Sequence, residues 1–497
     1  MRWSAVAVPV LVCCLLWPAS ASVDWGPVID KAARYWVALD EAEKLAQQAK
    51  SRQDPRHYLL PGHIRLHASK DCVYWTGKYG RARWETSGEV IYGTYSALSS
   101  IYAALLSGEV NVKRWPEPYR SRMATAVTTA LAKLLSLQQP DGGWGWKVVL
   151  TEGKVRFPGG RGHVLRTAQI LSEVLIPALR LNIRTVSLGP SRYDVAKCTQ
   201  AAVRFLLDQQ LEDGGFSANR SWSKTPDPLY TGWALRALCE AYLYRDLIGL
   251  SDRTVEQLKE AIRRAVEWLE RHQETSGEHA GLWKMTAAAI MGSEYAPPSE
   301  AQIAMGLLYA YMVADEVGLD KRRLADCINR ALKAIVDWAA KYSDASVVQV
   351  DGKKAVGWAY TSTRLKGRGP YVVHTALVLT SLALANRLGL GQEAISELNR
   401  LGATLETEQE WLYRECVQYD DLAAFPYPNR EHFMSVTASS QRAATLCAVA
   451  FSHPEVFLER LTRNVWDYVP RPKKRGIVPV LPVLTVAGLA LARLRRR

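Results

Sequence analysis

Tyrosine, histidine, arginine and carboxylate side chains recur along this chain where apolar helices are expected to begin. Seven of them have the chemistry of proton transfer on a sugar: Tyr92, Arg161, His163, Asp227, Glu300, Tyr371 and His374. An arginine can hold a sugar carboxylate with two parallel hydrogen bonds. A tyrosine or histidine can then remove a proton and return one to the leaving oxygen, as in lyases and epimerases. A hydrolase would use two acids instead, with Asp227 and Glu300 as the first pair.

Five neighbouring residues are expected to bind the substrate: Tyr95, Arg166, Tyr230, Trp233 and His432. Concave sites with several convergent polar groups are the usual ligand sites of proteins. Each residue alone also fits a structural role, because helix N-termini favour capping side chains such as Asp227 and because tyrosines fill ring centres. The hypothesis therefore requires that the set points into one open cavity.

Six loop aromatics reveal the elements that would position these residues. Trp75, Trp144, Phe216, Trp283, Trp358 and Phe425 follow one another at intervals of 67 to 75 residues. That period holds an outer helix, a turn and an inner helix, so six units predict an all-α (α/α)6 toroid of six inner and six outer helices. Outer helices are expected at 26–49, 119–138, 195–210, 254–272, 320–342 and 391–412. Inner helices are expected to begin near 92, 163, 229, 300, 371 and 433.

The two kinds of helix differ in pattern. Residues 254–272 have one apolar face and a charged remainder, which is typical of a helix with one side in water. Residues 371–390 are apolar all round, which indicates a helix buried on every side.

Two turns, at 137–146 and 207–216, resemble the Gln-Trp turns of the squalene cyclase and protein prenyltransferase repeat superfamily. The resemblance implies an (α/α)6 toroid or a relative of it. Paired glycines, Asp141 or Asp213 and the aromatic are expected to shape and anchor each turn.

The residues that these families use for catalysis are missing. The string Gln418-Tyr419-Asp420-Asp421 lacks the first aspartate of the DxDD acid of class II cyclases. The zinc set of the prenyltransferases would fall on Asp227 and His374, but its cysteine is absent. We therefore expect no cofactor, while a bound metal ion stays open.

The two ends predict an exported, anchored protein. Residues 1–21 have the basic start, apolar run and small-residue end of a signal peptide. Residues 22–470 then form the toroid domain, and 471–475 a basic linker. Residues 476–492 are uncharged and long enough for one short membrane span, followed by a basic cytoplasmic tail at 493–497. The domain is expected outside the cytoplasm. A buried terminal helix is the alternative for 476–492.

Charge excludes a nucleic-acid partner. The net charge is +14, but eight of the basic residues lie in 471–497 and one is Arg2, which leaves +5 for the domain. Such a surplus is ordinary for this length. After signal cleavage six cysteines remain, without CxxC spacing, and a pair such as Cys198 with Cys239 is conceivable because export permits disulfides.

Together these features predict a carbohydrate-active enzyme, of polysaccharide lyase, epimerase or hydrolase type, acting on a glycan in the central cavity. One alternative is a terpenoid cyclase-like or prenyltransferase-like protein acting on isoprenoid lipid, which requires an apolar, aromatic cavity. The other is a non-catalytic surface glycan-binding or scaffold protein, which requires a cavity filled by side chains or loops.

Overall fold

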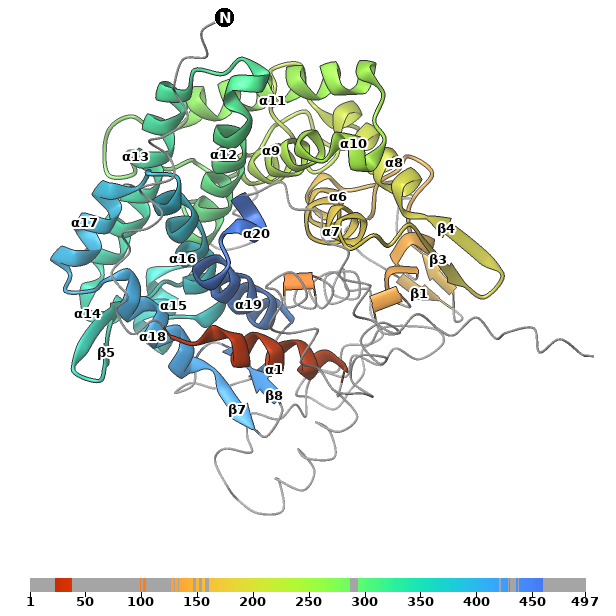
Figure 1. Ribbon diagram of the computed structural model, residues 1–497. Helices are drawn as coiled ribbons and strands as arrows, with labels where there is room; N and C mark the ends of the chain where they lie inside the picture. Colours follow the sequence, from red (N-terminus) through yellow and green to blue (C-terminus); the bar gives the residue numbers. More distant parts are fainter. Residues whose placement is uncertain are drawn as a thin grey trace, which may run out of the picture.

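The helices form a ring with an inner and an outer layer (Figure 1). The computed structural model describes residues 23–37, a few positions between 99 and 132, and residues 134–458 apart from 146–148, 152–153, 157–160, 287–293, 420–421, 428, 430–434 and 437. Inner helices pack side by side in the order α6, α9, α12, α16 and α19, and each contacts an outer helix. The described part of the chain is therefore an α/α toroid.

The inner layer has the following bounds: α6 (Val164–Ile170), η3 (Leu171–Leu175) and α7 (Ile176–Arg180) form one continuous rod, followed by α9 (Pro228–Leu243), α12 (Pro297–Val317), α16 (Val372–Arg387) and α19 (Ala438–Ser452). The outer layer consists of α1 (Trp25–Val37), α8 (Val195–Gln209), α11 (Asp252–His272), α13 (Lys321–Lys341), α17 (Gln392–Arg400) and α18 (Leu405–Glu415). Short helices connect or follow them: α10 (Arg245–Ile248), α14 (Ser343–Ser346), α15 (Ser362–Arg368) and α20 (Glu455–Leu458).

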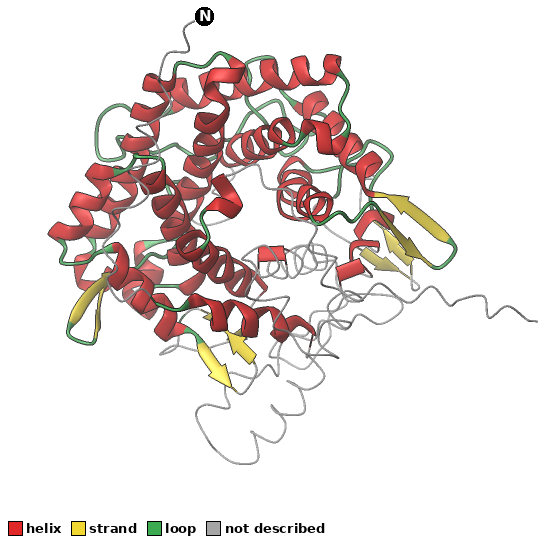
Figure 2. Cartoon of the chain, viewed as in Figure 1, coloured by secondary structure: helices red, strands yellow, loops and turns green. Residues whose placement is uncertain are grey.

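Strands are confined to two-stranded antiparallel pairs between helices (Figure 2). The pairs are β1 (Val149–Thr151) with β2 (Lys154–Arg156), β3 (Thr185–Leu188) with β4 (Ser191–Asp194), β5 (Val347–Val350) with β6 (Lys353–Val356), β7 (Val417–Tyr419) with β8 (Leu422–Ala424), and β9 (Pro426–Tyr427) with β10 (Ser435–Val436).

Burial follows the sequence pattern. Every residue of α9 is buried, whereas α11 buries one stripe that includes Leu258, Ile262 and Leu269. Two outer helices begin at capping side chains, Ser251 before α11 and Asp320 before α13, which accept backbone N–H groups of the first turn. The inner layer is thus enclosed on all sides by the outer layer.

The Gln-Trp turns join neighbouring outer helices. Gln210 Nε2 donates to the carbonyl of Gly214 in its own turn and to that of Ala261 in α11, both at 2.9 Å. Gln138 and Gln273 do the same toward α8 and α13. Gly214 has φ +99°, and a Cβ there would lie 2.4 Å from the Arg264 carbonyl oxygen, so only glycine fits.

The loop aromatics anchor the turns as expected. Trp144, Phe216, Trp283, Trp358 and Phe425 are all fully buried. Each backbone N–H is held by a side chain four residues into the next inner helix, which is a threonine in three repeats, Glu300 in the fourth and Gln441 in the sixth. Trp75 lies outside the described residues.

The element predictions that fall on described residues hold with two corrections. The outer helix expected at 26–49 is described only to Val37, and the helices expected at 119–138 and from near 92 lie largely outside the described residues. The outer helix expected at 391–412 is divided into α17 and α18, because the chain turns at Gly402, which has φ +84°. The last inner helix begins at Ala438 rather than near 433, because β9 and β10 pair before it. Cys198 and Cys239 carry free thiols, so the disulfide considered between them is absent.

The predicted signal peptide, basic linker, membrane segment and tail lie outside the described residues. Among the residues that the structure describes, no helix is long and apolar enough to cross a bilayer.

Candidate functional site

His163 and Asp227 lie together at the start of two adjacent inner helices. The His163 ring contacts the Tyr230 ring edge-on, with centroids 5.5 Å apart. Burial, followed by the charge of Arg166, lowers the pKa of His163 to about 3. Asp227 caps α9 by accepting the Leu229 N–H at 2.9 Å. Burial, then the Asp227 charge, raises the pKa of Tyr230 to about 12.

Tyr371 and His374 form a second packed group at the start of α16. Their rings stack with centroids 5.0 Å apart, and Tyr360 contacts His374 edge-on at 4.3 Å. His374 is buried, and burial followed by the Arg364 charge lowers its pKa to about 3. A histidine held neutral in this way has the character of a core residue.

Glu300 lies in the first turn of α12 and holds the turn that contains Trp283. It is fully buried, and its carboxyl group accepts the Trp283 N–H at 3.2 Å. Burial raises its pKa well above the ordinary value, the Trp283 hydrogen bond opposes this, and the Asp227 charge adds to it. Its position is that of the turn-anchoring threonines of the other repeats.

The remaining predicted residues that the structure describes lie apart from these groups. Arg161 is exposed, and the buried Arg166 donates to Gln169 Oε1 at 2.8 Å. Tyr92, Tyr95 and His432 lie outside the described residues. The described members of the set are thus divided between two packed aromatic groups, a turn and the surface. Trp233 alone lies beside a different site, where its ring contacts the guanidinium groups of Arg236 and Arg442.

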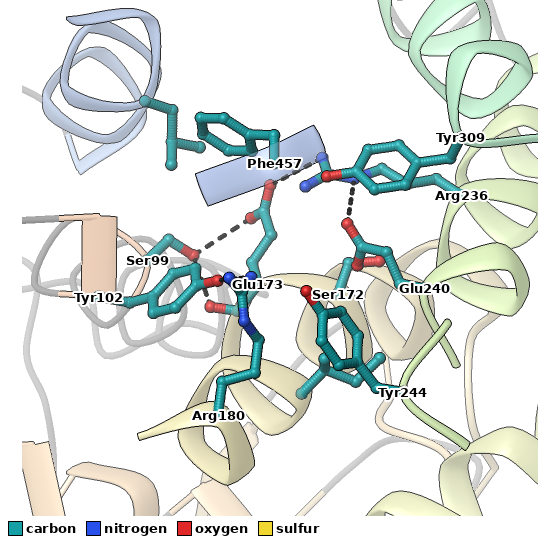
Figure 3. A pocket seen from close by; sticks show the side chains of 12 residues that line it. Ser99, Tyr102, Ser172, Glu173, Arg180, Arg236, Glu240, Tyr244, Tyr309 and Phe457 are labelled. Atoms are coloured by element: carbon teal, nitrogen blue, oxygen red, sulfur yellow. Dashed lines mark hydrogen bonds and ion pairs between the residues drawn. The ribbon is translucent and has the colours of Figure 1, made fainter. Parts of the chain in front are cut away.

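That site is a polar pocket in the middle of the ring, which none of the predicted residues lines (Figure 3). Its wall comes from the rod of η3 and α7, from α9, α12, α19 and α20, and from two residues near position 100. The lining residues are Ser99, Tyr102, Ser172, Glu173, Ile176, Arg180, Arg236, Glu240, Tyr244, Tyr309, Leu446 and Phe457. Ser172 and Glu173 lie on η3, a single turn of π-helix. Such turns interrupt α-helices frequently at functional sites, because they shift the side chains that follow.

Glu173 is the centre of a buried ion-pair network. Its carboxylate accepts bonds from Arg442, from Arg236 Nη1 at 3.4 Å and from the Ser99 hydroxyl at 3.3 Å. Arg236 Nε also donates to Glu240 Oε1 at 3.2 Å, so one guanidinium bridges two carboxylates. Burial disfavours the charge on Arg236, but Glu240 and Tyr309 together outweigh it and raise the pKa. Arg236 therefore keeps its charge despite burial.

Arg180 forms the second half of the pocket with two tyrosines. Its Nη1 donates to the Tyr102 hydroxyl at 2.6 Å, and its Nη2 to the Val456 carbonyl at 3.1 Å. The guanidinium lies 5.0 Å from the centroid of the Tyr244 ring. Burial raises the pKa of Tyr102, although Arg180 acts in the opposite direction, so the hydroxyl keeps its proton at neutral pH.

Two polar atoms of the wall have no hydrogen-bond partner in the described chain: Glu240 Oε2 and Ser172 Oγ. Both residues are buried. Leaving a buried polar group without a partner costs free energy, so such atoms mark places where a ligand or water completes the site. The room that remains is about 20 Å³, enough for about one water molecule.

The sequence carried a signal for this pocket. Arg236 and Glu240 stand four residues apart within an otherwise uncharged apolar stretch, Pro228 to Leu243, and charges inside a helix buried on all sides need a partner or a role. The search for polar residues at helix starts missed them because they lie further along the helix. No cluster of metal-binding side chains is found among the residues that the structure describes.

Comparisons with solved structures find several proteins to which this chain is similar at low identity. Cellobiose 2-epimerase from Bacillus thermoamylovorans has 11% identity and a TM-score of 0.46, over 83% of this chain and 98% of the other. A mutant of Rex8A from Paenibacillus barcinonensis, complexed with an arabinofuranosyl-xylotetraose, has 12% identity and a TM-score of 0.42, over 86% and 94%. A polysaccharide lyase has 13% identity and a TM-score of 0.36, over 67% and 80%.

No family model matches the chain, and no curated protein is similar to it in sequence. The class that the structure defines is thus an α/α toroid with a buried charged pocket at its centre.

Proposed function

We propose that the chain is a carbohydrate-active enzyme, of polysaccharide lyase, epimerase or hydrolase type, whose reaction takes place in the central pocket. The observation that carries this proposal is Glu240. One of its oxygens is fixed by Arg236, and the other is buried at the pocket wall without a partner in the described chain. A carboxyl group oriented on one side and open on the other is suited to accept or donate a proton.

The neighbouring groups support a sugar as the substrate. The hydroxyls of Tyr102, Tyr244 and Tyr309 can exchange hydrogen bonds with sugar hydroxyls, and Glu173 holds Arg236 in place. Two guanidinium groups and two carboxylates line the wall, which would disfavour the hydrocarbon of an isoprenoid lipid. The cyclase-like alternative is therefore the weaker one.

The substitution Glu240→Gln tests the proposal, since it keeps the shape of the side chain and removes proton transfer. The full chain would be assayed on a panel of glycans with three readouts: ultraviolet absorbance of unsaturated ends for a lyase, new reducing ends for a hydrolase, and NMR of the sugar ring for an epimerase. We expect activity in one readout and a loss of about 100-fold or more in the variant.

Glu316→Gln serves as the matched control, because Glu316 pairs with Arg245 and does not line the pocket. It should retain full activity. Silence in all three readouts over the whole panel, or equal losses in both variants, would exclude Glu240 as the proton-transfer group.

A non-catalytic glycan-binding or scaffold protein is the second candidate, favoured by one observation. Phe457 lines the pocket, and the pocket has room for about one water molecule, about 20 Å³. Saturable glycan binding without turnover would support this candidate.

We further propose that the protein is exported and held at the membrane by residues 476–492, with its domain outside the cytoplasm. The support is the signal-like pattern of 1–21 and the uncharged segment between basic residues. The mature N-terminus should be Ser22, and a chain ending at residue 470 should leave the membrane fraction. An uncleaved N-terminus with an unchanged distribution would overturn both points.

A further inference from the structure

The one-turn helix α20 lies inside the ring, next to the central pocket (Figures 1 and 3). It follows α19 after His453 and Pro454, and its Phe457 side chain forms part of the pocket wall. Its Val456 carbonyl accepts the hydrogen bond from Arg180 Nη2. A segment of the chain itself thus forms one side of the pocket and accepts a hydrogen bond from Arg180.

Arg180 is built to hold an anionic group. It is buried, and its guanidinium is fixed by the Tyr102 hydroxyl and by the Tyr102 and Tyr244 rings, with centroid distances of 5.8 and 5.0 Å. A guanidinium offers planar, paired N–H groups that match the two oxygens of a carboxylate. Here two of its nitrogens donate to neutral oxygens, one from a tyrosine and one from a backbone carbonyl.

We infer that Arg180 is the binding site for the carboxylate of an acidic sugar, and that α20 is an internal plug that must leave before the sugar enters. The inference rests on the proposed function, since it names the substrate class and the regulation of the same pocket. Ser172 Oγ and Glu240 Oε2, which lack partners in the described chain, would complete the contacts of the entering sugar.

Exchange of the plug for a carboxylate would give Arg180 a charged acceptor in place of the neutral Val456 carbonyl. A hydrogen bond between two charged groups is roughly twice as strong as one to a neutral acceptor. A helix of one turn has little stability of its own, so α20 depends on Phe457 and on the Val456 contact to stay in place. Only molecules in which α20 has left the pocket can bind the sugar. The apparent affinity is therefore the intrinsic affinity multiplied by the fraction of such molecules.

Phe457→Ala in the full chain tests the plug, with D-glucuronate as the probe and D-glucose as its neutral match. Affinities would be measured by isothermal titration calorimetry. We expect Phe457→Ala to bind glucuronate at least about tenfold more tightly than the wild type, with no comparable gain for glucose. Adding Arg180→Lys should remove most of that gain, because lysine lacks the paired N–H groups.

Two controls keep the result interpretable. Phe451→Ala removes the same side chain from the end of α19, where Phe451 packs against the core outside the pocket wall, and should leave the affinity unchanged. Replacement of Glu455–Leu458 by Gly-Gly-Ser-Gly removes the plug by a second route, in case Phe457→Ala fails to fold, and should repeat the gain.

The outcomes separate this inference from the proposed function. Equal glucuronate affinities in the wild type and in both opened variants would overturn the plug. An equal gain for glucose would overturn Arg180 as a carboxylate site. Tight glucuronate binding without turnover of any glycan would contradict the proposed enzymatic function but support the carboxylate site. Turnover that does not change when α20 is altered would support the enzymatic function but contradict the plug.

Discussion

Glu300 shows how one position can hold different side chains for the same structural task. In the fourth repeat its carboxyl group accepts the Trp283 N–H, and in the sixth Gln441 Oε1 accepts the Phe425 N–H at 2.9 Å. Three other repeats use a threonine hydroxyl. A carboxyl group is the costliest of these choices, because it must be buried either protonated or charged.

The substitution Glu300→Gln should therefore stabilise the protein at high pH. The raised pKa means that folded Glu300 keeps a proton which the unfolded chain releases above its ordinary pKa, so this group weakens stability as pH rises. We expect a gain of about 1 kcal/mol or more near pH 8 that shrinks toward pH 5, measured by urea unfolding. Unchanged stability at both pH values, or a large loss of catalytic activity, would contradict a purely structural Glu300.

His374 gives the opposite pH dependence. Its pKa is lowered to about 3, so below about pH 6.5 the unfolded chain binds a proton that the folded protein does not. The free energy of unfolding therefore decreases by about 1.4 kcal/mol for each unit by which the pH is lowered. His374→Phe keeps a ring between Tyr371 and Tyr360 and should flatten this part of the curve. His272→Phe, at an exposed position of α11, is the control. The same slope in the wild type and in His374→Phe would contradict the buried neutral histidine.

Residues that cap helices or anchor turns could be predicted from the sequence more easily than residues that line the pocket. The sequence predicts Trp144, Trp283 and Trp358 as turn anchors, and for Asp227 it offers capping as the alternative to catalysis, because these structural roles depend on neighbours close in sequence. The Glu173 network joins residues as far apart as 269 positions, so its geometry exists only once the ring has closed.

Among the elements, the glutamine of each Gln-Trp turn connects its own turn to the next outer helix. Gln210→Ala would remove two hydrogen bonds and leave the carbonyls of Gly214 and Ala261 short of a donor. We expect a loss of about 2 kcal/mol in the free energy of unfolding. The exposed Gln257 of α11 is the matched control, and its replacement by alanine should change stability by less than about 0.5 kcal/mol. Equal effects of the two substitutions would contradict the connecting role.

The period and the helix types could be predicted because each repeat contains its own pattern: an amphipathic helix, a glycine turn and an apolar helix. The sequence contains no such pattern for η3 or for α20. Residues 164–180 show apolar periodicity without a sign of the wider turn, and α20 is too short to have a period. Both elements depend on packing inside the finished ring.

At the scale of the molecule, the first outer helix closes the ring against the last repeat. Gln441 Nε2, on α19, donates to the Ala32 carbonyl of α1 at 3.4 Å, across 409 residues of sequence. Trp25 of α1 is buried, its Nε1 donates to Gln409 at 3.3 Å and its ring meets Tyr413 edge-on. This seam is what distinguishes a toroid from an open stack of repeats, in which each unit contacts only its neighbours.

Trp25→Ala should open the seam without disturbing the opposite side of the ring. A large aromatic lost from a core costs about 3 to 5 kcal/mol, and because the loss falls on α1 and its partners, hydrogen exchange should accelerate in α1 and α19 while α11 and α13 stay protected. Trp268→Ala, an equally buried tryptophan of α11, is the matched control and should expose the opposite side instead.

If both variants lose protection uniformly, the ring unfolds as one cooperative unit and the α1 seam contributes no more than any other interface. If α19 keeps its protection in Trp25→Ala, the last repeat is stable without closure, and the central pocket, which α19 helps to form, should bind its ligand in the opened ring as well.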